Sequence, residues 1–157
     1  MLRKIVAVCV WGLLSTLSTH IIDLSQEPPL TIREVPLNLI TTLSDAKCVA
    51  STLYGESRGE PLEGSRAVLD VIQERMLSRD MTACQVVSEP GQFAGYNSKR
   101  LITINMLTAL ATVVKMSPVA PEAQYFHTIG TRVNWKHTKL LTTVGKHGFY
   151  VTTGEAR

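Results

Sequence analysis

One short acidic stretch holds the residues best suited to acid-base chemistry. Glu56 follows an apolar run and precedes Arg58-Gly59, where the backbone can approach a groove. A carboxyl in such a place would be partly shielded from water, as a general acid often is. Composition alone favours a simpler interpretation, a solvated glutamate at a helix end. Glu60 precedes Pro61 and is expected in a loop or at a helix cap.

The histidines suggest a second kind of chemistry. His127, His137 and His147 recur every ten residues. A zinc ion needs about three protein ligands that converge in space, and this spacing does not indicate convergence. The chain also lacks a glycine-rich phosphate loop, a Cys-x-x-Cys pair, a His-Glu-x-x-His motif and a Gly-x-Ser-x-Gly motif. We therefore expect no metal and no cofactor.

The charge balance limits the possible partners. The 157 residues include 16 Lys+Arg and 13 Asp+Glu, a net charge of +3, and they fit one globular domain. Without Arg3 and Lys4 the balance is 14 against 13, or +1. A nucleic-acid protein normally has a clustered basic face, so no nucleic-acid partner is expected.

The N-terminus has the pattern of an export signal. Arg3-Lys4 precede an apolar run from Ile5 to Leu17, which predicts a signal peptide over residues 1–22. The same segment could instead stay uncleaved as a signal-anchor in the inner membrane. Either way, the chain is expected to be exported to the periplasm or cell envelope. Residues 23–41 contain three prolines and predict an extended linker, followed by a folded unit over 42–157.

The folded unit is predicted to be mainly helical. Helices are expected from Ser44-Asp45 to about Gly55, over 61–78, in a short element capped by Asp80 or Thr82, and over 99–116. The last of these is apolar nearly all around, so it should be central. Residues 124–128 and 142–144 are short and β-prone. The predicted fold class is mainly α (α+β), with a small irregular β-containing C-terminal flap.

Motifs in a fixed order resolve the ambiguity of Glu56. They are Glu56-Ser57-Arg58-Gly59-Glu60-Pro61-Leu62-Glu63-Gly64, Ala67-Val68, Glu74-Arg75, Cys84-Gln85-Val86-Val87, Gln92-Phe93, Tyr125-Phe126-His127, Trp135, and Gly145-Lys146-His147-Gly148-Phe149-Tyr150. Over about residues 46–150 the chain resembles the spore-cortex lytic enzyme (SleB-type) family of cell wall hydrolases. A small exported enzyme of this kind also resembles bacteriophage endolysins with a signal-arrest-release N-terminus.

The resemblance implies a lysozyme-like catalytic domain over 42–157 that acts on peptidoglycan glycan strands. Its catalytic residue would be Glu56, which would cleave the β-1,4 bond between N-acetylmuramic acid and N-acetylglucosamine. One carboxylate is enough for a lytic transglycosylase, which leaves a 1,6-anhydro end. A hydrolytic muramidase and a non-catalytic wall-binding protein are the alternatives. The expected substrate-binding residues are Ser57, Gln92, Phe93, Tyr96, Tyr125, His127, Trp135, His147 and Tyr150. A monomer is expected.

Two cysteines of the folded unit have two open interpretations. Cys48 and Cys84 could form a disulfide in an oxidising compartment. They could equally be buried free thiols that behave as small apolar residues. Spacing alone does not fix their proximity.

Overall fold

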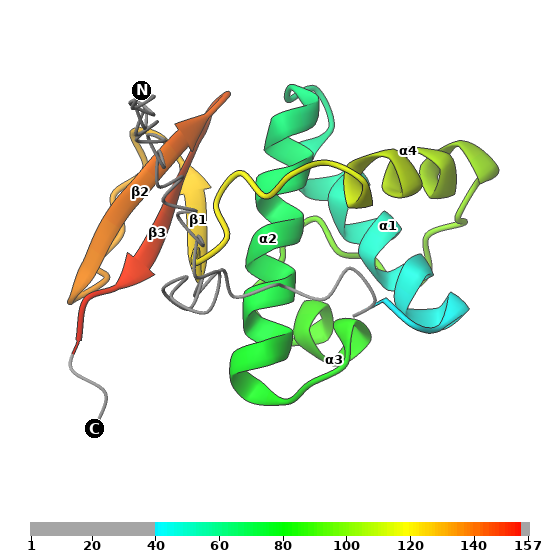
Figure 1. Cartoon of the computed structure of the whole chain (residues 1–157), viewed down its shortest axis with the longest axis horizontal. Coiled ribbons are helices and arrows are strands. Elements are labelled where there is room, and N and C mark those ends of the chain that lie inside the picture. Colours follow the sequence, from blue (N-terminus) through cyan, green and yellow to red (C-terminus); the bar gives the residue numbers. More distant parts are fainter. Residues whose placement is uncertain (1–39, 155–157) are drawn as a thin grey trace, which may run out of the picture. The chain divides into compact units, whose positions relative to one another are not determined.

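The computed structural model describes residues 40–154, so the expected signal segment and nearly all of the expected linker lie outside the described residues. Figure 1 shows a central helix, α2, with a three-stranded sheet on one side and the other helices, α1, α3 and α4, on the other. The elements in chain order are α1 (Leu43–Ser57), α2 (Leu62–Arg79), α3 (Ala83–Ser88), α4 (Ile104–Val114), β1 (Tyr125–Thr128), β2 (Thr138–Val144) and β3 (His147–Thr152). The prediction of a mainly helical unit with a small β-containing C-terminal part is confirmed.

Side-chain caps fix where the helices begin. The N-cap of α1 is Thr42, two residues before the predicted Ser44, and the Thr42 hydroxyl accepts from the Asp45 backbone N–H at 3.0 Å. The N-cap of α3 is Thr82, one of the two predicted caps, and Thr82 forms a reciprocal capping box with Gln85. Asp45 is buried and its carboxylate also accepts from the Cys84 backbone N–H at 3.1 Å. The start of α1 is thereby joined to the start of α3.

The centre of the fold is α2, and the prediction of a central helix over 99–116 is wrong. Buried residues on α2 include charged and polar side chains as well as apolar ones. Arg66 and Asp70 form a buried ion pair at 2.8 Å, and Asp70 also accepts the backbone N–H groups of Val119 and Ala120 at 2.7 and 2.8 Å. Polar residues that satisfy one another inside the protein allow a polar-looking helix to be the core element.

The predicted fourth helix is shorter and more peripheral than expected. α4 begins only after Thr103, whose hydroxyl accepts from the Met106 backbone N–H at 3.3 Å. Leu110 and Val113 are its buried residues, whereas Ile104 is 74% exposed. Leu101, which the prediction placed within the helix, lies before it and is 85% exposed. Apolar residues around a helix therefore did not mean burial here.

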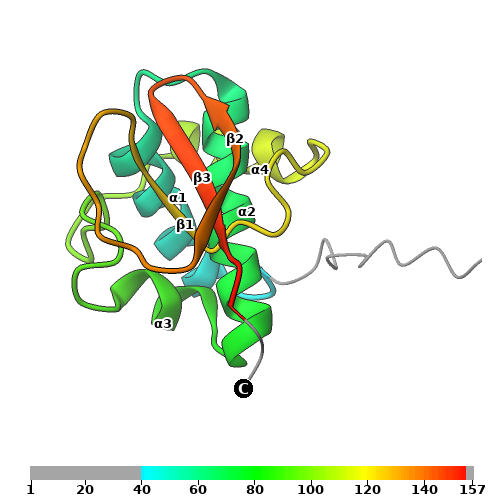
Figure 2. The ribbon, with the colours of Figure 1, turned by 90° about the vertical axis from the view of Figure 1, so that its left-hand side faces the viewer.

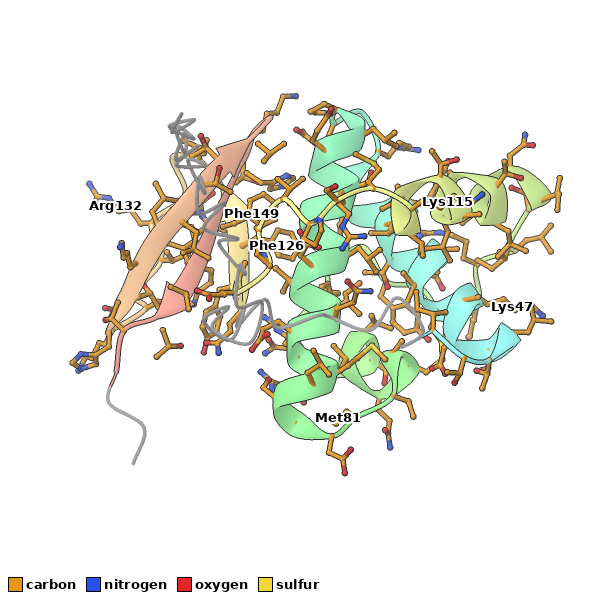
Figure 3. The ribbon with its side chains drawn as sticks, viewed as in Figure 1. Lys47, Met81, Lys115, Phe126, Arg132 and Phe149 are labelled. Carbon is orange, nitrogen blue, oxygen red and sulfur yellow. A yellow bond between two sulfur atoms is a disulfide. The ribbon has the colours of Figure 1, made fainter. Side chains whose placement is uncertain are left out.

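The sheet lies against α2 through one of its faces. Its strand order is β1-β3-β2 and both pairings are antiparallel. Phe126 of β1 and Phe149 of β3 are register partners whose rings stack at 5.8 Å, and Figure 3 places them between the sheet and α2. Figure 2, turned by 90° about the vertical axis, shows the sheet in front of the helices. β3 was not predicted as a strand, and β2 is longer than the β-prone segment 142–144.

A disulfide joins Cys48 of α1 to Cys84 of α3, which decides between the two interpretations that the sequence left open. It links the helices that also share the bond between Asp45 and Cys84. Within residues 40–154, no helix has both the length and the apolar composition needed to cross a membrane.

Candidate active site

Glu56 lies in the last turn of α1 with its side chain half-buried. Its Oε1 atom accepts a hydrogen bond from the backbone N–H of Gly95 at 2.6 Å. Gly95 belongs to the loop between α3 and α4, so two segments that are distant in sequence meet at this carboxylate. A backbone donor fixes the orientation of the carboxylate, because it does not rotate as a side-chain donor does.

This hydrogen bond depends on close contact between two glycine backbones. A Cβ atom on Gly55 would overlap the carbonyl oxygen of Gly95, and one on Gly95 would overlap the Gly55 carbonyl carbon. Residues without side chains are therefore required on both sides. The sequence indicated a glycine before Glu56 and a glycine-containing loop, but a single sequence does not reveal that the two pack together.

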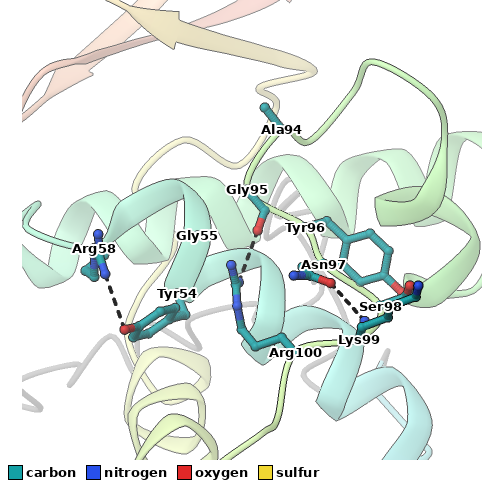
Figure 4. Close-up of a pocket in the computed structure, with 10 residues that line it drawn as sticks. All are labelled: Tyr54, Gly55, Arg58, Ala94, Gly95, Tyr96, Asn97, Ser98, Lys99 and Arg100. Atoms are coloured by element: carbon teal, nitrogen blue, oxygen red, sulfur yellow. Dashed lines mark hydrogen bonds between the residues drawn. The ribbon is translucent and has the colours of Figure 1, made fainter.

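The loop is fastened to α1 just after Gly95. The Ser51 hydroxyl donates to the Asn97 carbonyl at 2.9 Å and accepts from the Asn97 N–H at 3.3 Å. The Arg100 guanidinium donates to the carbonyl oxygens of Ser51 and Gly95, as Figure 4 shows for Gly95. These bonds hold the Gly95 peptide against the end of α1.

Glu60, the second glutamate of the motif, binds the tip of the β2–β3 hairpin. Its Oε2 atom accepts from the backbone N–H of Lys146 at 2.9 Å. A Cβ atom on Gly145 would overlap this same carboxylate oxygen, and Gly145 has a φ of +56°. Glu60 therefore connects the end of α1 to the sheet. The sequence placed Glu60 correctly in a loop but did not reveal this partner.

Several other carboxylates belong to the framework. The Asp45 carboxylate accepts from the Thr42 hydroxyl and from the Cys84 N–H. Asp70 bonds Arg66 and the Val119 N–H, and Glu89 pairs with Arg79 at 2.6 Å. These groups are occupied by bonds that hold elements together. Glu56 differs from them because its hydrogen bond comes from the Gly95 loop. This loop, residues 94–100, also lines an open hollow at the end of α1.

Four of the residues expected to bind substrate form one cluster. His127 stacks on Tyr150 with ring centroids 5.0 Å apart, and Trp135 contacts both rings, at 5.2 and 5.7 Å. Tyr125 joins the cluster through Trp135 at 5.1 Å. Strand alternation puts Tyr125 and His127 on the face of the sheet opposite to Phe126. We call Tyr125, His127, Trp135 and Tyr150 the aromatic cluster; all four are half-buried.

Three expected residues are instead buried in the framework. Ser57 is buried, and its hydroxyl donates to the Leu53 carbonyl at 2.7 Å. Phe93 is part of the hydrophobic core. His147 is buried edge-on against Phe126 at a centroid distance of 5.6 Å. They support the site from inside and do not form its surface.

Gln92 and Tyr96 lie in the loop that carries Gly95. Gln92 is exposed and its amide oxygen accepts from Arg75 at 2.9 Å. Tyr96 packs against the core and also lines the hollow beside Gly95. Of the two, Tyr96 is therefore the one that lines the hollow.

Arg75 is a junction that the sequence did not indicate as functional. It lies on α2, donates to the Gln124 carbonyl at 2.9 Å, and stacks on Phe93 and Tyr125 at 5.1 and 5.7 Å. Burial, followed by the nearby Arg79 charge, lowers the pKa of Arg75 to about 10, so it stays charged at neutral pH. It ties α2 to β1 and to the loop before Gly95.

The predicted absence of a metal site stays a prediction. Among residues 40–154, no group of three or more His, Cys, Asp or Glu side chains is arranged to hold a metal ion. His127 lies in the aromatic cluster, and His147 lies on the opposite face of the sheet.

Comparison with known proteins identifies the class. The family model described as cell wall hydrolase matches residues 59–150, more than half of the chain, so this protein belongs to the cell wall hydrolase family. The match begins three residues after Glu56. The resemblance found in the sequence motifs is thus confirmed at the level of the family.

Particular relatives are spore cortex-lytic enzymes. The chain is 30% identical over 113 residues to the spore cortex-lytic enzyme of Bacillus cereus, covering 68% of this chain and 44% of that protein. It therefore spans less than half the length of this curated relative. The catalytic domain of the Bacillus cereus SleB protein superposes with a TM-score of 0.58 at 27% identity, over 69% of this chain and 90% of that one.

A second solved structure agrees. The catalytic domain of the germination-specific lytic transglycosylase SleB from Bacillus anthracis gives a TM-score of 0.53 at 26% identity. The alignment covers 69% of this chain and 94% of that domain. Residues 40–154 thus have the fold of these catalytic domains.

Proposed function

We propose that this protein cuts peptidoglycan glycan strands as a lytic transglycosylase, with Glu56 as the acid and then the base. The observation that carries the proposal is the geometry of Glu56: a half-buried carboxylate at the end of a helix, fixed through one oxygen by the Gly95 N–H. A preorganised proton donor is what general acid catalysis requires.

The geometry suggests which oxygen moves the proton. Because Oε1 accepts the Gly95 N–H, the proton to be transferred resides on the other oxygen of Glu56. That oxygen would protonate the glycosidic oxygen between N-acetylmuramic acid and N-acetylglucosamine. The muramic 2-acetamido group would stabilise the cationic centre. Glu56, now ionised, would remove the proton from the 6-hydroxyl, which closes the 1,6-anhydro ring without consuming water.

The single acid favours transglycosylation over hydrolysis. Most glycosidases use two carboxyl groups about 5–10 Å apart, one as acid and one as nucleophile or base. Here Glu60, the acid nearest in sequence, is bound to the hairpin at Lys146, and Asp45 and Asp70 are framework groups. The Bacillus anthracis relative is described as a lytic transglycosylase, which supports the same reaction type.

The aromatic cluster is proposed as a surface that contacts sugar rings. Tyr125, His127, Trp135 and Tyr150 present half-buried rings away from the core. Aromatic faces suit the apolar faces of sugars, while their hydroxyl and ring nitrogen groups can bond to the sugar substituents. Since the substrate lies outside the inner membrane, we propose that the enzyme acts in the cell envelope. We also propose that it is a monomer.

The test is a matched pair of substitutions in the same motif. Glu56→Gln keeps the shape and the Gly95 contact but removes the proton, so lysis of purified peptidoglycan should fall by about 10²–10⁴-fold. Glu63→Gln removes an exposed carboxylate seven residues away and should lyse like wild type. Circular dichroism would check that both variants fold. Full lysis by Glu56→Gln would exclude the proposed role of Glu56, whereas absence of lysis by the wild type would favour a non-catalytic wall-binding protein.

A further inference from the structure

An open hollow of about 540 Å³ is lined by Gly55 and Gly95, the two glycines that contact each other next to Glu56 (Figure 4). Its walls come from the last turns of α1 and from the loop that precedes α4. The lining residues are Tyr54, Gly55, Arg58, Ala94, Gly95, Tyr96, Asn97, Ser98, Lys99 and Arg100. They include three cations and no carboxylate. The hollow is therefore a place of unbalanced positive charge.

Two of the cations converge on one aromatic ring. The guanidinium carbon of Arg58 lies 5.4 Å from the centroid of Tyr54, and that of Arg100 lies 5.1 Å from it. Arg58 also donates to the Tyr54 hydroxyl at 3.4 Å, and Figure 4 shows Tyr54 between the two arginines. Cation–π contact keeps both guanidinium groups near the opening of the hollow without neutralising them.

Within residues 40–154, none of these three cations forms a salt bridge. The salt bridges within residues 40–154 are Arg66–Asp70 and Arg79–Glu89, and neither involves the cations of the hollow. Arg58 and Lys99 are exposed, so both can reach a ligand. A planar guanidinium group binds a carboxylate through two parallel hydrogen bonds, so a carboxylate is the best fit for Arg58, and Lys99 adds a second positive charge.

The hollow is mechanically connected to Glu56 through one peptide. The Gly95 N–H donates to Glu56, and the Gly95 carbonyl accepts from Arg100 at 3.1 Å. Gly95 therefore both lines the hollow and holds the Glu56 carboxylate. A ligand bound in the hollow by Arg58 and Lys99 would lie against the peptide that orients the carboxylate proposed to cut the strand.

We propose that this hollow binds a carboxylate of the peptidoglycan strand and so positions the glycan at Glu56. The inference rests on the proposed function, because it assigns a second part of the same substrate. Two sources of that carboxylate exist in peptidoglycan: the peptide stem, and the lactyl group of muramic acid where the stem has been removed. Arg58 and Lys99 are positioning residues in this account and take no part in proton transfer.

The test compares variants on three substrates. The substrates are glycan strands with peptide stems, strands with stems removed by an amidase, and strands whose carboxyl groups have been converted to amides. The variants are Arg58→Gln and Lys99→Gln, with Lys115→Gln as the control because Lys115 is an exposed lysine at the end of α4. Arg100 is not replaced, since it also holds the loop.

On strands with stems, Arg58→Gln is expected to raise KM about tenfold and Lys99→Gln by a smaller factor, with kcat within about twofold of wild type. Arg58→Lys should recover part of the loss, because the charge returns without the planar fork. Lys115→Gln should behave as wild type. On carboxyl-amidated strands, wild type and all variants should converge. Loss of the difference on amidase-treated strands assigns the stem carboxylate, and a difference retained there shows that the hollow also accepts the lactyl carboxylate, which is free only on those strands.

Binding without turnover separates this proposal from the proposed function. The same substitutions placed in the Glu56→Gln background should weaken binding of stem-bearing strands. For Arg58→Gln the Kd should rise by the same factor of about ten. Charge-dependent binding in a wild-type protein that cuts nothing would overturn the proposed activity alone. Two results would overturn the carboxylate site. The variants would bind and cut every substrate as wild type does, or their KM and Kd would rise as much on carboxyl-amidated strands as on stem-bearing strands.

Discussion

Glu56 and the aromatic cluster lie on two regions that are anchored by different means. The region around Glu56 is fastened by the Cys48–Cys84 disulfide, by the Gly55–Gly95 contact and by the Arg100 bonds to the loop. The sheet that carries the aromatic cluster is joined to the helices by fewer directional contacts. They are the Glu60 bond to the hairpin, the Arg75 bond to Gln124 and the stacked rings beneath the sheet.

This difference matches the tolerance of the two proposed tasks. A group that transfers a proton must be held within a few tenths of an ångström of its productive position, and an error of about 1 Å can cost a factor of about 100 in rate. A surface that stacks on sugar rings tolerates small shifts, because apolar contact depends weakly on direction. The stronger anchoring therefore supports the acid and the weaker anchoring supports the proposed binding face.

The largest expected effect is on the helical region. Replacing Cys48 and Cys84 by alanine opens a loop with a sequence separation of 36 and should lower the free energy of unfolding by about 3–4 kcal/mol. Urea unfolding of the variant and of the wild type would measure this, and reduced wild type should match the variant. A loss below about 1 kcal/mol would mean that the disulfide is not what anchors this region.

The next effect concerns the two glycine backbones. Gly95→Ala puts a methyl group against Gly55, so the loop must move and Glu56 loses its fixed donor. We expect kcat to fall about 100-fold, with a stability loss of about 1–3 kcal/mol. The control is Gly91→Ala in the same loop, where a methyl group meets open space and only the φ of +75° is unfavourable. Gly91→Ala should lower the free energy of unfolding by about 1–2 kcal/mol and leave kcat unchanged. Equal kcat for both variants would contradict the positioning role.

A smaller effect should follow loss of the hairpin anchor. Glu60→Ala removes the acceptor of the Lys146 N–H and should lower the free energy of unfolding by about 1 kcal/mol. The loss should be local, so backbone amides at the β2–β3 turn should exchange their hydrogens faster. Glu122→Ala removes an exposed carboxylate and should stay within about 0.5 kcal/mol of wild type. If Glu60→Ala abolished lysis with normal exchange at the turn, Glu60 would be part of the chemistry and the single-acid mechanism would be wrong.

The smallest effect is expected at the aromatic cluster. Trp135→Ala removes the ring that contacts His127 and Tyr150 and should raise KM for glycan strands about threefold to fivefold, with kcat unchanged. Val133→Ala, an exposed apolar position in the same segment, is the matched control. Unchanged KM in Trp135→Ala would remove the cluster from the proposed binding surface.

Local signals in the sequence predicted some parts of the fold well. The helix found at Leu62–Arg79 was predicted over 61–78, and Thr82 was one of two predicted caps of α3. Both depend on residues adjacent in sequence. The centre of the fold was assigned to the wrong helix, because α2 buries Arg66 and Asp70 in a paired network that resembles a solvated surface in the sequence.

The candidate site shows the same limit. Motif order predicted Glu56, but the hydrogen bond from Gly95 and the contact of two glycines arise from a loop 39 residues away. His147 and Phe93 have the residue types of a binding site, and tertiary packing placed both in the interior. Neither the cysteine pairing nor the partner of Glu60 follows from spacing, since both are set by how distant elements pack.

The most direct test of the central claim is mass spectrometry of the muropeptides released by wild type and Glu56→Gln from the same peptidoglycan, digested in ¹⁸O-water. The single-acid mechanism predicts 1,6-anhydro ends without ¹⁸O from wild type and no such ends from Glu56→Gln. Reducing ends carrying ¹⁸O from wild type would identify a hydrolytic muramidase and contradict the account.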